Sequence, residues 1–191
     1  MILGSASPRR KELLARICPR FVVHASQIEE PLDPGPIPDA VAALALRKAA
    51  AVARGAAASA IVLGADTVVV VDQDVLGKPA DAREARAMLG RLRGRAHQVV
   101  TGVAVMDSST GRSASSAVTS TVFMERYGDA VIESYVASGE PLDKAGAYAI
   151  QGLGGDLING LIGSYSNVVG LPLGETRRLL SAFGVPVRSP R

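Results

Sequence analysis

The order of apolar and polar positions predicts a chain in which helices and strands alternate. Helical spacing of apolar residues predicts helices from Pro8 through Ile17, from Pro38 to about Gly55, and over residues 81–92, 128–138 and about 174–183. Apolar runs and strict alternation predict strands at MILG, at residues 21–25 and 61–71, and in a hairpin of residues 97–107 and 116–124. This pattern is typical of an α/β fold with a mixed sheet.

Two stretches fit neither period and are predicted to be loops. The segment SQIEEPLDPGPIP contains four prolines, and residues 146–170 are rich in glycine. The sequence shows no internal repeat, no low-complexity tract and no shift in composition that would mark a domain boundary. We therefore expect a single domain over residues 1–191.

Composition excludes several classes of function. The net charge is 21 − 18 = +3 with scattered basic residues, and aromatic residues make up only 4% with no Trp, so extended nucleic-acid binding is not expected. The single cysteine, Cys18, rules out an internal disulfide and fits a reducing cytoplasm. No apolar run approaches the ~20 residues of a membrane span. We expect a cytoplasmic protein that does not enter the membrane.

The stretch SASPRRKELL places positive charge where a helix disfavours it. Ser7 and Pro8 suit the N-cap and the first helical position, yet Arg9, Arg10 and Lys11 follow at the positive end of the helix dipole. A phosphate would relieve this repulsion, because helix N-termini and arginine side chains both bind phosphate oxygens. The hydroxyl of Ser5 is a further donor. The alternative is a solvated basic turn.

The strand over residues 61–71 contains a charge among apolar residues. A carboxylate at Asp66 must be ion-paired, hydrogen-bonded or bound to metal if the strand is buried. Its neighbour Thr67 is either a ligand contact or an ordinary strand residue. Lys78 lies within Gly-Lys-Pro, and Lys48 is the single charge of KAAAVA. For both lysines the alternative to a functional role is plain exposure to solvent.

The remaining polar candidates lie in the two predicted loops. Glu29 and Glu30 are suited to bind a hard divalent cation or to orient water, and the alternative is that they are solvated loop residues. Gln151 stands in a glycine-rich loop that suits closure over a ligand. With His24 and His97 as the only histidines, a zinc site or a Ser-His-Asp triad is poorly supported. Cations combined with carboxylates favour hydrolysis of a phosphoanhydride assisted by Mg²⁺ or Mn²⁺.

Five motifs in one order carry a family resemblance: SASPRRKELL, GADTVVVVDQDVLGKP, HQVVTGV, DKAGAYAIQGLGG and GSYSNVVGLPL. From about residue 2 to residue 182 the chain resembles the Maf-like nucleotide pyrophosphatases. The resemblance implies metal-dependent hydrolysis of nucleoside triphosphates to the monophosphate and pyrophosphate. It also implies an elongated, twisted mixed sheet flanked by helices, two lobes with a nucleotide cleft between them, an architecture related to inosine triphosphatase, and a homodimer.

The same resemblance assigns roles to residues by their position in these motifs. It implies a catalytic and metal-binding carboxylate at Asp66 with help from Glu30, catalytic lysines at Lys48 and Lys78, and substrate-binding residues at Ser5, Arg9, Arg10, Thr67 and Gln151. Arg9, Thr67 and Gln151 fit the branch that acts on dTTP and UTP. The alternatives are a pyrophosphatase for purine or modified nucleotides such as 7-methyl-GTP, and a non-catalytic nucleotide sensor linked to cell division. Gly4 and Asp156 depart from the family pattern, which puts only the packing of the late loop in question.

Overall fold

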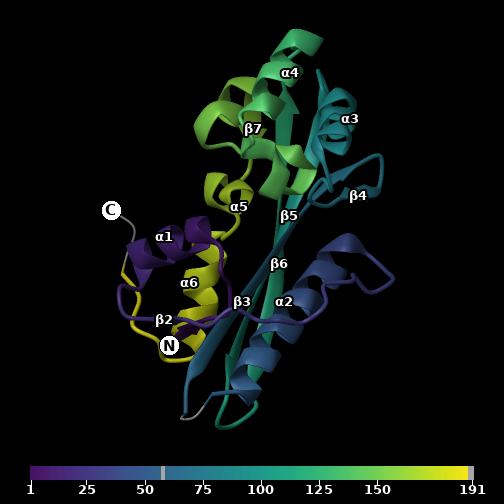
Figure 1. Cartoon of the computed structure of the whole chain (residues 1–191). Coiled ribbons are helices and arrows are strands. Elements are labelled where there is room, and N and C mark those ends of the chain that lie inside the picture. The colour runs from purple at the N-terminus through teal and green to yellow at the C-terminus, as the bar shows by residue number, and fades with distance from the viewer. Residues whose placement is uncertain (57–58, 189–191) are drawn as a thin grey trace. The chain divides into compact units, whose positions relative to one another are not determined.

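A computed structural model describes residues 1–56 and 59–188, which form two compact units. Unit 1 takes its described residues from Met1–Asp66, Thr101–Val118 and Gly170–Arg191, and unit 2 consists of Thr67–Val100 and Thr119–Val169. The strands, drawn as arrows in Figure 1, are β1 (Ile2–Leu3), β2 (Val22–Val23), β3 (Ile61–Val71), β4 (Asp74–Leu76), β5 (Ala96–Asp107), β6 (Ser113–Met124) and β7 (Ile158–Ile162). The α-helices are α1 (Pro8–Ile17), α2 (Ile37–Arg54), α3 (Ala82–Leu92), α4 (Asp129–Ala137), α5 (Tyr165–Val169) and α6 (Leu173–Ala182). Short 3₁₀ turns, η1 (Glu140–Asp143), η2 (Ala145–Ala147) and η3 (Gly152–Leu157), fill the segment before β7.

The strands form a mixed sheet in the order β2-β1-β3-β5-β6-β7, with β4 paired to β3. β1 runs parallel to both β2 and β3, whereas β4 pairs antiparallel with β3 and β7 antiparallel with β6. This confirms the predicted α/β class with a mixed sheet flanked by helices. β3, β5 and β6 each pass from one unit into the other. The single domain over residues 1–191 and the nucleotide cleft between two lobes stay predictions.

In unit 1, α2 packs closely along the sheet (Figure 1) because glycines remove the side chains that would keep it away. A Cβ at Gly64 of β3 would collide with the carbonyl oxygen of Ala45 and lie 2.9 Å from the amide nitrogen of Ala49. Gly102 of β5 faces the backbone of α2 at Val41 in the same way. The apolar cluster beneath this contact is built from small side chains: Ala45, Ala49, Val52, Ala53, Val62 and Ala104.

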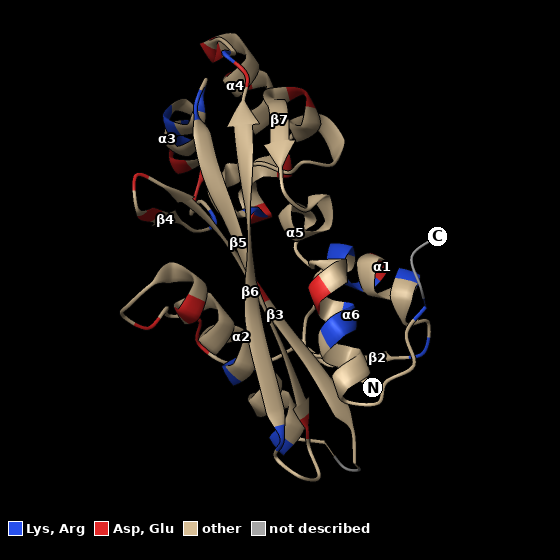
Figure 2. Cartoon of the chain, turned by 180° about the vertical axis from the view of Figure 1, so that it is seen from behind, with Lys and Arg blue, Asp and Glu red and all other residues tan. Residues whose placement is uncertain are grey.

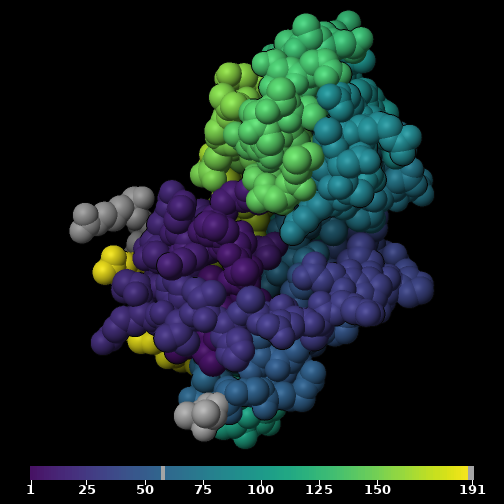
Figure 3. Space-filling model, in the orientation of Figure 1, coloured from purple at the N-terminus to yellow at the C-terminus, as the bar shows by residue number. Residues whose placement is uncertain are grey.

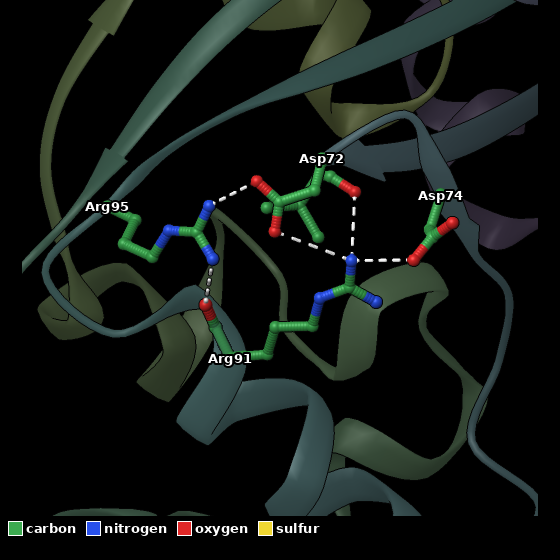
Figure 4. A network of polar contacts seen from close by, with 5 residues as sticks. Asp72, Asp74, Arg91 and Arg95 are labelled. Atoms are coloured by element: carbon green, nitrogen blue, oxygen red, sulfur yellow. Dashed lines mark hydrogen bonds and ion pairs between the residues drawn. The ribbon is translucent and has the colours of Figure 1, made fainter.

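In unit 2, a second apolar core lies under α3 and α4 and includes Leu89, Leu92, Val99, Val122 and Ile132. The β3–β4 turn beside it has positive φ angles of 52° at Asp72 and 69° at Gln73, as a two-residue hairpin of the favoured twist requires. Two arginines hold this turn (Figure 4): Arg91 contacts Asp74 at 2.7 Å, and Arg95 contacts Asp72. Arg91 also donates a hydrogen bond to the carbonyl oxygen of Val71, and Arg95 donates one to the carbonyl oxygen of Arg91. The β3–β4 hairpin, which leads to Lys78, is therefore fixed to the end of α3.

A buried histidine is a further polar feature of unit 2. His97 of β5 is 3% exposed, and its Nε2 lies 2.7 Å from the hydroxyl of Tyr148. The two rings meet edge to face, with centroids 5.3 Å apart. Burial lowers the pKa of His97 to about 4, so the side chain is neutral at pH 7. His24, by contrast, is exposed.

The low pKa of His97 predicts acid-sensitive folding. The unfolded chain takes up a proton at an ordinary pKa near 6.5, whereas folded His97 resists protonation down to about 4. The free energy of unfolding should therefore be undiminished above pH 6.5 and fall as the pH drops toward 4, by about 3 kcal/mol in all. Denaturant unfolding at pH 7.5, 5.5 and 4.5 measures this fall for wild type and for His97→Gln.

The variant should lose most of this dependence between pH 6.5 and 4.5, while His24→Gln should retain it. Carboxylates also destabilise the fold at the acid end, so the difference between the two variants is the quantity that reports on His97. If the free energy of unfolding depends on pH equally in His97→Gln and in wild type, His97 is not the source of this acid sensitivity.

Some expected elements differ in extent, and others were not predicted. The strand expected at residues 21–25 is reduced to β2, whose Val22 is 63% exposed. β7 and α5 lie in the glycine-rich region where we expected only a loop. Over residues 1–56 and 59–188, no helix has both the length and the apolar composition needed to cross a bilayer.

Candidate functional site

The candidate site centres on a lysine that two carboxylates share in unit 1. The Nζ of Lys48 lies 2.7 Å from Oδ1 of Asp66 and 2.6 Å from Oε1 of Glu30. The side chains of Lys48 and Asp66 are 6% and 11% exposed, whereas that of Glu30 is 57% exposed. The charge predicted to be buried in β3 therefore has its partner on α2, and one edge of the cluster is open to solvent.

Local structure explains how these three residues meet. Lys48 falls on the buried face of α2, at helical spacing from Leu44, Ala45 and Val52, so its ammonium must point toward the sheet. The close approach of α2 at Gly64 brings it within reach of Asp66, which follows Gly64 on the same face of β3.

The loop that carries Glu30 is also fixed to α2. Arg47, the neighbour of Lys48 on α2, forms an ion pair with Asp33 and donates a hydrogen bond to the carbonyl oxygen of Pro31. The segment with the highest share of prolines is thereby held next to the lysine. In the space-filling view of Figure 3, purple to indigo N-terminal residues cover much of the face of unit 1 that is turned to the viewer.

The carboxylates fit a cation that arrives with a ligand better than a cation held by protein alone. Within residues 1–56 and 59–188, no group of three or more His, Cys, Asp or Glu side chains is arranged to hold a metal ion. Mg²⁺ commonly takes only one or two carboxylates and completes its shell with water and substrate phosphates. Asp66 and Glu30, which approach one Nζ from two sides, match that donor set.

The start of α1 is built as the sequence predicts. Ser7 is the N-cap, and its Oγ accepts a hydrogen bond from the amide of Arg10, with Pro8 at the first helical position. The first turn contains no acidic residue. Figure 2 shows Lys and Arg on α1, and three of these residues, Arg9, Arg10 and Lys11, follow Pro8 at the helix end where positive charge is least favourable. An anionic ligand would supply the missing countercharge.

The side chain of Arg10, the second arginine of this turn, is held by two hydrogen bonds. The Nε of Arg10 donates a hydrogen bond to the carbonyl oxygen of Gly170 at 2.8 Å, and its Nη1 donates to Oγ of Ser5 at 3.2 Å. Burial lowers the pKa of Arg10, while the charges of Asp66 and Glu30 act to raise it. Arg10 thus ties α1 to the segment before α6 and stands in the electrostatic field of both carboxylates. Ser5 is buried at 8% exposure, beside the half-buried Arg10.

The other predicted site residues belong to unit 2. Thr67 is the first residue of that unit on β3, half-buried, and Lys78 is exposed directly after β4. The carbonyl oxygen of Gly77 accepts a hydrogen bond from the amide of Gly146, which attaches the lysine segment to the start of the glycine-rich region. Gln151 lies half-buried between η2 and η3. Asp156, which departs from the family pattern, is exposed to solvent and so does not have to pack in the core.

Sequence reasoning missed the residues that hold the loop around Gln151. Glu140 of η1 accepts hydrogen bonds from the amides of Leu153 and Gly154, and Tyr135 of α4 donates its hydroxyl to the same carboxylate. In a single sequence, a glutamate before a proline carries no sign of such contacts. The glycines at 152 and 154 were the available signal, since glycine often marks a close approach of backbone to another group.

Known proteins resemble this chain along nearly its whole length. The model of the Maf-like protein family matches residues 1–183. A dTTP/UTP pyrophosphatase of Moorella thermoacetica is 50% identical over 188 residues, which covers 98% of this chain and 96% of the relative. The dTTP/UTP pyrophosphatase of Myxococcus xanthus is 49% identical over 188 residues, covering 98% and 94%. A similar protein of Symbiobacterium thermophilum, of the same name, is also 49% identical, covering 98% and 95%. With its motifs in the family order and a match of this extent, the chain belongs to the Maf-like protein family.

Proposed function

We propose that this protein hydrolyses dTTP and UTP to the nucleoside monophosphate and pyrophosphate. The observation that carries the proposal is the buried Lys48 in contact with Asp66 and Glu30, because this cluster places an ammonium group that can contact phosphate beside carboxylates that can hold a cation and accept a proton from water. The relatives named dTTP/UTP pyrophosphatase, at about 50% identity, support the choice of substrate.

Positive charge holds the triphosphate. Arg9 at the start of α1 binds phosphate oxygens, and Arg10 and Ser5, which are hydrogen-bonded to each other, hold that turn in place. The family resemblance adds Lys48 and Lys78 as further contacts of the phosphate chain. Each of these cations stabilises the negative charge that spreads over the phosphoryl oxygens in the transition state.

Asp66 accepts the proton of the attacking water. The water oxygen forms a bond to the α-phosphorus, the bond from that phosphorus to the α,β-bridging oxygen breaks, and pyrophosphate leaves with the electron pair. Asp66 and Glu30 are also the residues that would hold Mg²⁺ or Mn²⁺. Such a cation, when bound, neutralises phosphate charge and makes water more acidic. This assistance matters because a carboxylate is a weak base at neutral pH.

Thr67 and Gln151 read the pyrimidine edge in this proposal. Side-chain hydroxyl and amide groups discriminate bases by donating and accepting hydrogen bonds, and a site built around them rejects bases that leave them unpaired. The pairing of Arg9, Thr67 and Gln151 with the dTTP/UTP branch comes from the family resemblance.

The test is a panel of nucleotides assayed for pyrophosphate release. We expect dTTP and UTP to be turned over faster than CTP, ITP and 7-methyl-GTP with Mg²⁺ or Mn²⁺, and chelation by EDTA to abolish the activity. A preference for 7-methyl-GTP would instead favour the modified-nucleotide pyrophosphatase. Tight nucleotide binding without turnover would favour the non-catalytic sensor.

We further propose that the enzyme is a cytoplasmic homodimer. The family resemblance supports the dimer, and a single buried cysteine, Cys18, supports a reducing compartment. Sedimentation equilibrium over a hundredfold range of protein concentration tests the assembly, and the mass of one chain throughout would refute it.

A further inference from the structure

The glycine-rich loop around Gln151 is held by hydrogen bonds on both sides of that residue. Before it, the amide of Ala149 donates to the hydroxyl of Tyr135 at 3.3 Å. After it, the amides of Leu153 and Gly154 donate to the carboxylate of Glu140 at 3.2 and 3.1 Å. All of these groups belong to unit 2.

The two anchoring side chains are joined to each other. The hydroxyl of Tyr135 donates to Oε1 of Glu140 at 3.0 Å while it accepts the bond from Ala149. One carboxylate and one phenol therefore serve three backbone amides of a single loop. Tyr135 is 4% exposed and fixed in the core of unit 2, so the anchor itself is rigid.

Glycine is required where the loop meets this anchor. A Cβ at Gly152 would lie 2.7 Å from Oε2 of Glu140, and the φ angle of 79° is one that other residues rarely adopt. A Cβ at Gly154 would lie 2.5 Å from the hydroxyl of Tyr135. The glycines of QGLGG thus permit the backbone to close onto Glu140 and Tyr135.

The charge states suit these contacts. Partial burial acts to raise the pKa of Glu140, but hydrogen bonds from Gly154, Tyr135 and Leu153 outweigh it, and the pKa lies below its ordinary value. Burial, with the neighbouring carboxylate, raises the pKa of Tyr135. At neutral pH, Glu140 is an ionised acceptor and Tyr135 a protonated donor.

We propose that Glu140, braced by Tyr135, is a positioning residue that sets the backbone on both sides of Gln151 and thereby sharpens base discrimination. This inference rests on the proposed function, in which Gln151 reads the base. Discrimination by an amide requires its donor and acceptor to be held in one orientation, because a loose group bonds to the wrong base as well. The carboxylate of Glu140 contacts the loop amides and Tyr135, and it is not assigned a contact with substrate.

The experiment compares Glu140→Gln with wild type and with Glu133→Gln. Glu133 pairs with Arg86 on the surface of the same unit, so its variant controls for the loss of one carboxylate. We expect Glu140→Gln to speed hydrogen exchange at the amides of Leu153 and Gly154 about tenfold, since a charged acceptor is lost. The ratio of kcat/KM for UTP over CTP should fall by a similar factor, mainly through KM, and Glu133→Gln should change neither.

A double-mutant cycle separates positioning from a general loss of structure. If Glu140 acts through Gln151, adding Glu140→Gln to Gln151→Ala should cause no further loss of discrimination. Tyr135→Phe, which keeps the ring and removes only the hydroxyl, should reproduce the effect in weaker form even if Glu140→Gln folds poorly. Faster exchange at Leu153 and Gly154 with unchanged discrimination, or additive losses in the cycle, would overturn the proposal.

Different results would refute the role of Glu140 and the proposed function. If wild type releases no pyrophosphate from dTTP or UTP, the proposed function is wrong. If Glu140→Gln prefers UTP over CTP as strongly as wild type does, the proposed function stands and only the role of Glu140 is refuted.

Discussion

Replacing Asp66 by asparagine should lower kcat for dTTP about a thousandfold, because the amide neither accepts the proton of the attacking water nor supplies a charged metal ligand. Asparagine has nearly the same size and retains one oxygen toward Lys48. The lysine also keeps Glu30, which lies 2.6 Å from its Nζ, so a buried charge is not left without a partner. Initial rates of pyrophosphate release, with a thermal melt of the same sample, measure the effect.

Asp129→Asn is the matched control for this prediction. Its carboxylate is 88% exposed and pairs with Arg93 on the surface of unit 2, so the same chemical change there should leave kcat unaltered. Release of pyrophosphate by Asp66→Asn at the wild-type rate would remove Asp66 from the chemical step.

The second large effect concerns stability. Gly64→Ala should reduce the free energy of unfolding by about 3 kcal/mol or more, because the new methyl group meets the backbone of α2 and no side-chain rotation relieves the clash. Either α2 moves outward or β3 bends. Both outcomes separate Lys48 from Asp66, so activity should fall together with stability. Denaturant unfolding monitored by circular dichroism provides the measurement.

Gly90→Ala provides the opposite case. Gly90 lies within α3, and a Cβ there would meet no heavy atom within 4 Å. Alanine is the better helix former, so this variant should gain about 0.5–1 kcal/mol. Equal stability of the two variants would mean that the contact between α2 and β3 is looser than the structure indicates.

Much of the fold follows from short-range patterns in the sequence. β3 covers the predicted residues 61–71, and α1 has the predicted cap because Ser7 and Pro8 favour one helix start whatever lies around them. β7 was missed because Asn159 and Gly160 interrupt the apolar alternation on which strand prediction depends. β7 is ordered by its pairing with β6, which is a tertiary effect.

The candidate site was predictable in kind but only partly in its contacts. A buried carboxylate at Asp66 demanded a partner, and the structure supplies one. That this partner is Lys48 depends on a packing distance between α2 and β3 that no local pattern encodes, although helical spacing does put Lys48 on the apolar face. The hydrogen bond from Arg10 to the carbonyl oxygen of Gly170 joins residues far apart in the sequence, so no local pattern predicts it either.

The interleaving of the two units determines when each can fold during synthesis. The chain leaves unit 1 after Asp66, returns at Thr101, leaves again after Val118 and comes back at Gly170. Unit 2 has all of its residues once Val169 has left the ribosome, whereas unit 1 must wait for α6. Proteins generally fold as their segments emerge. The residues Met1–Asp66 of unit 1 therefore emerge first and wait longest for the rest of their unit.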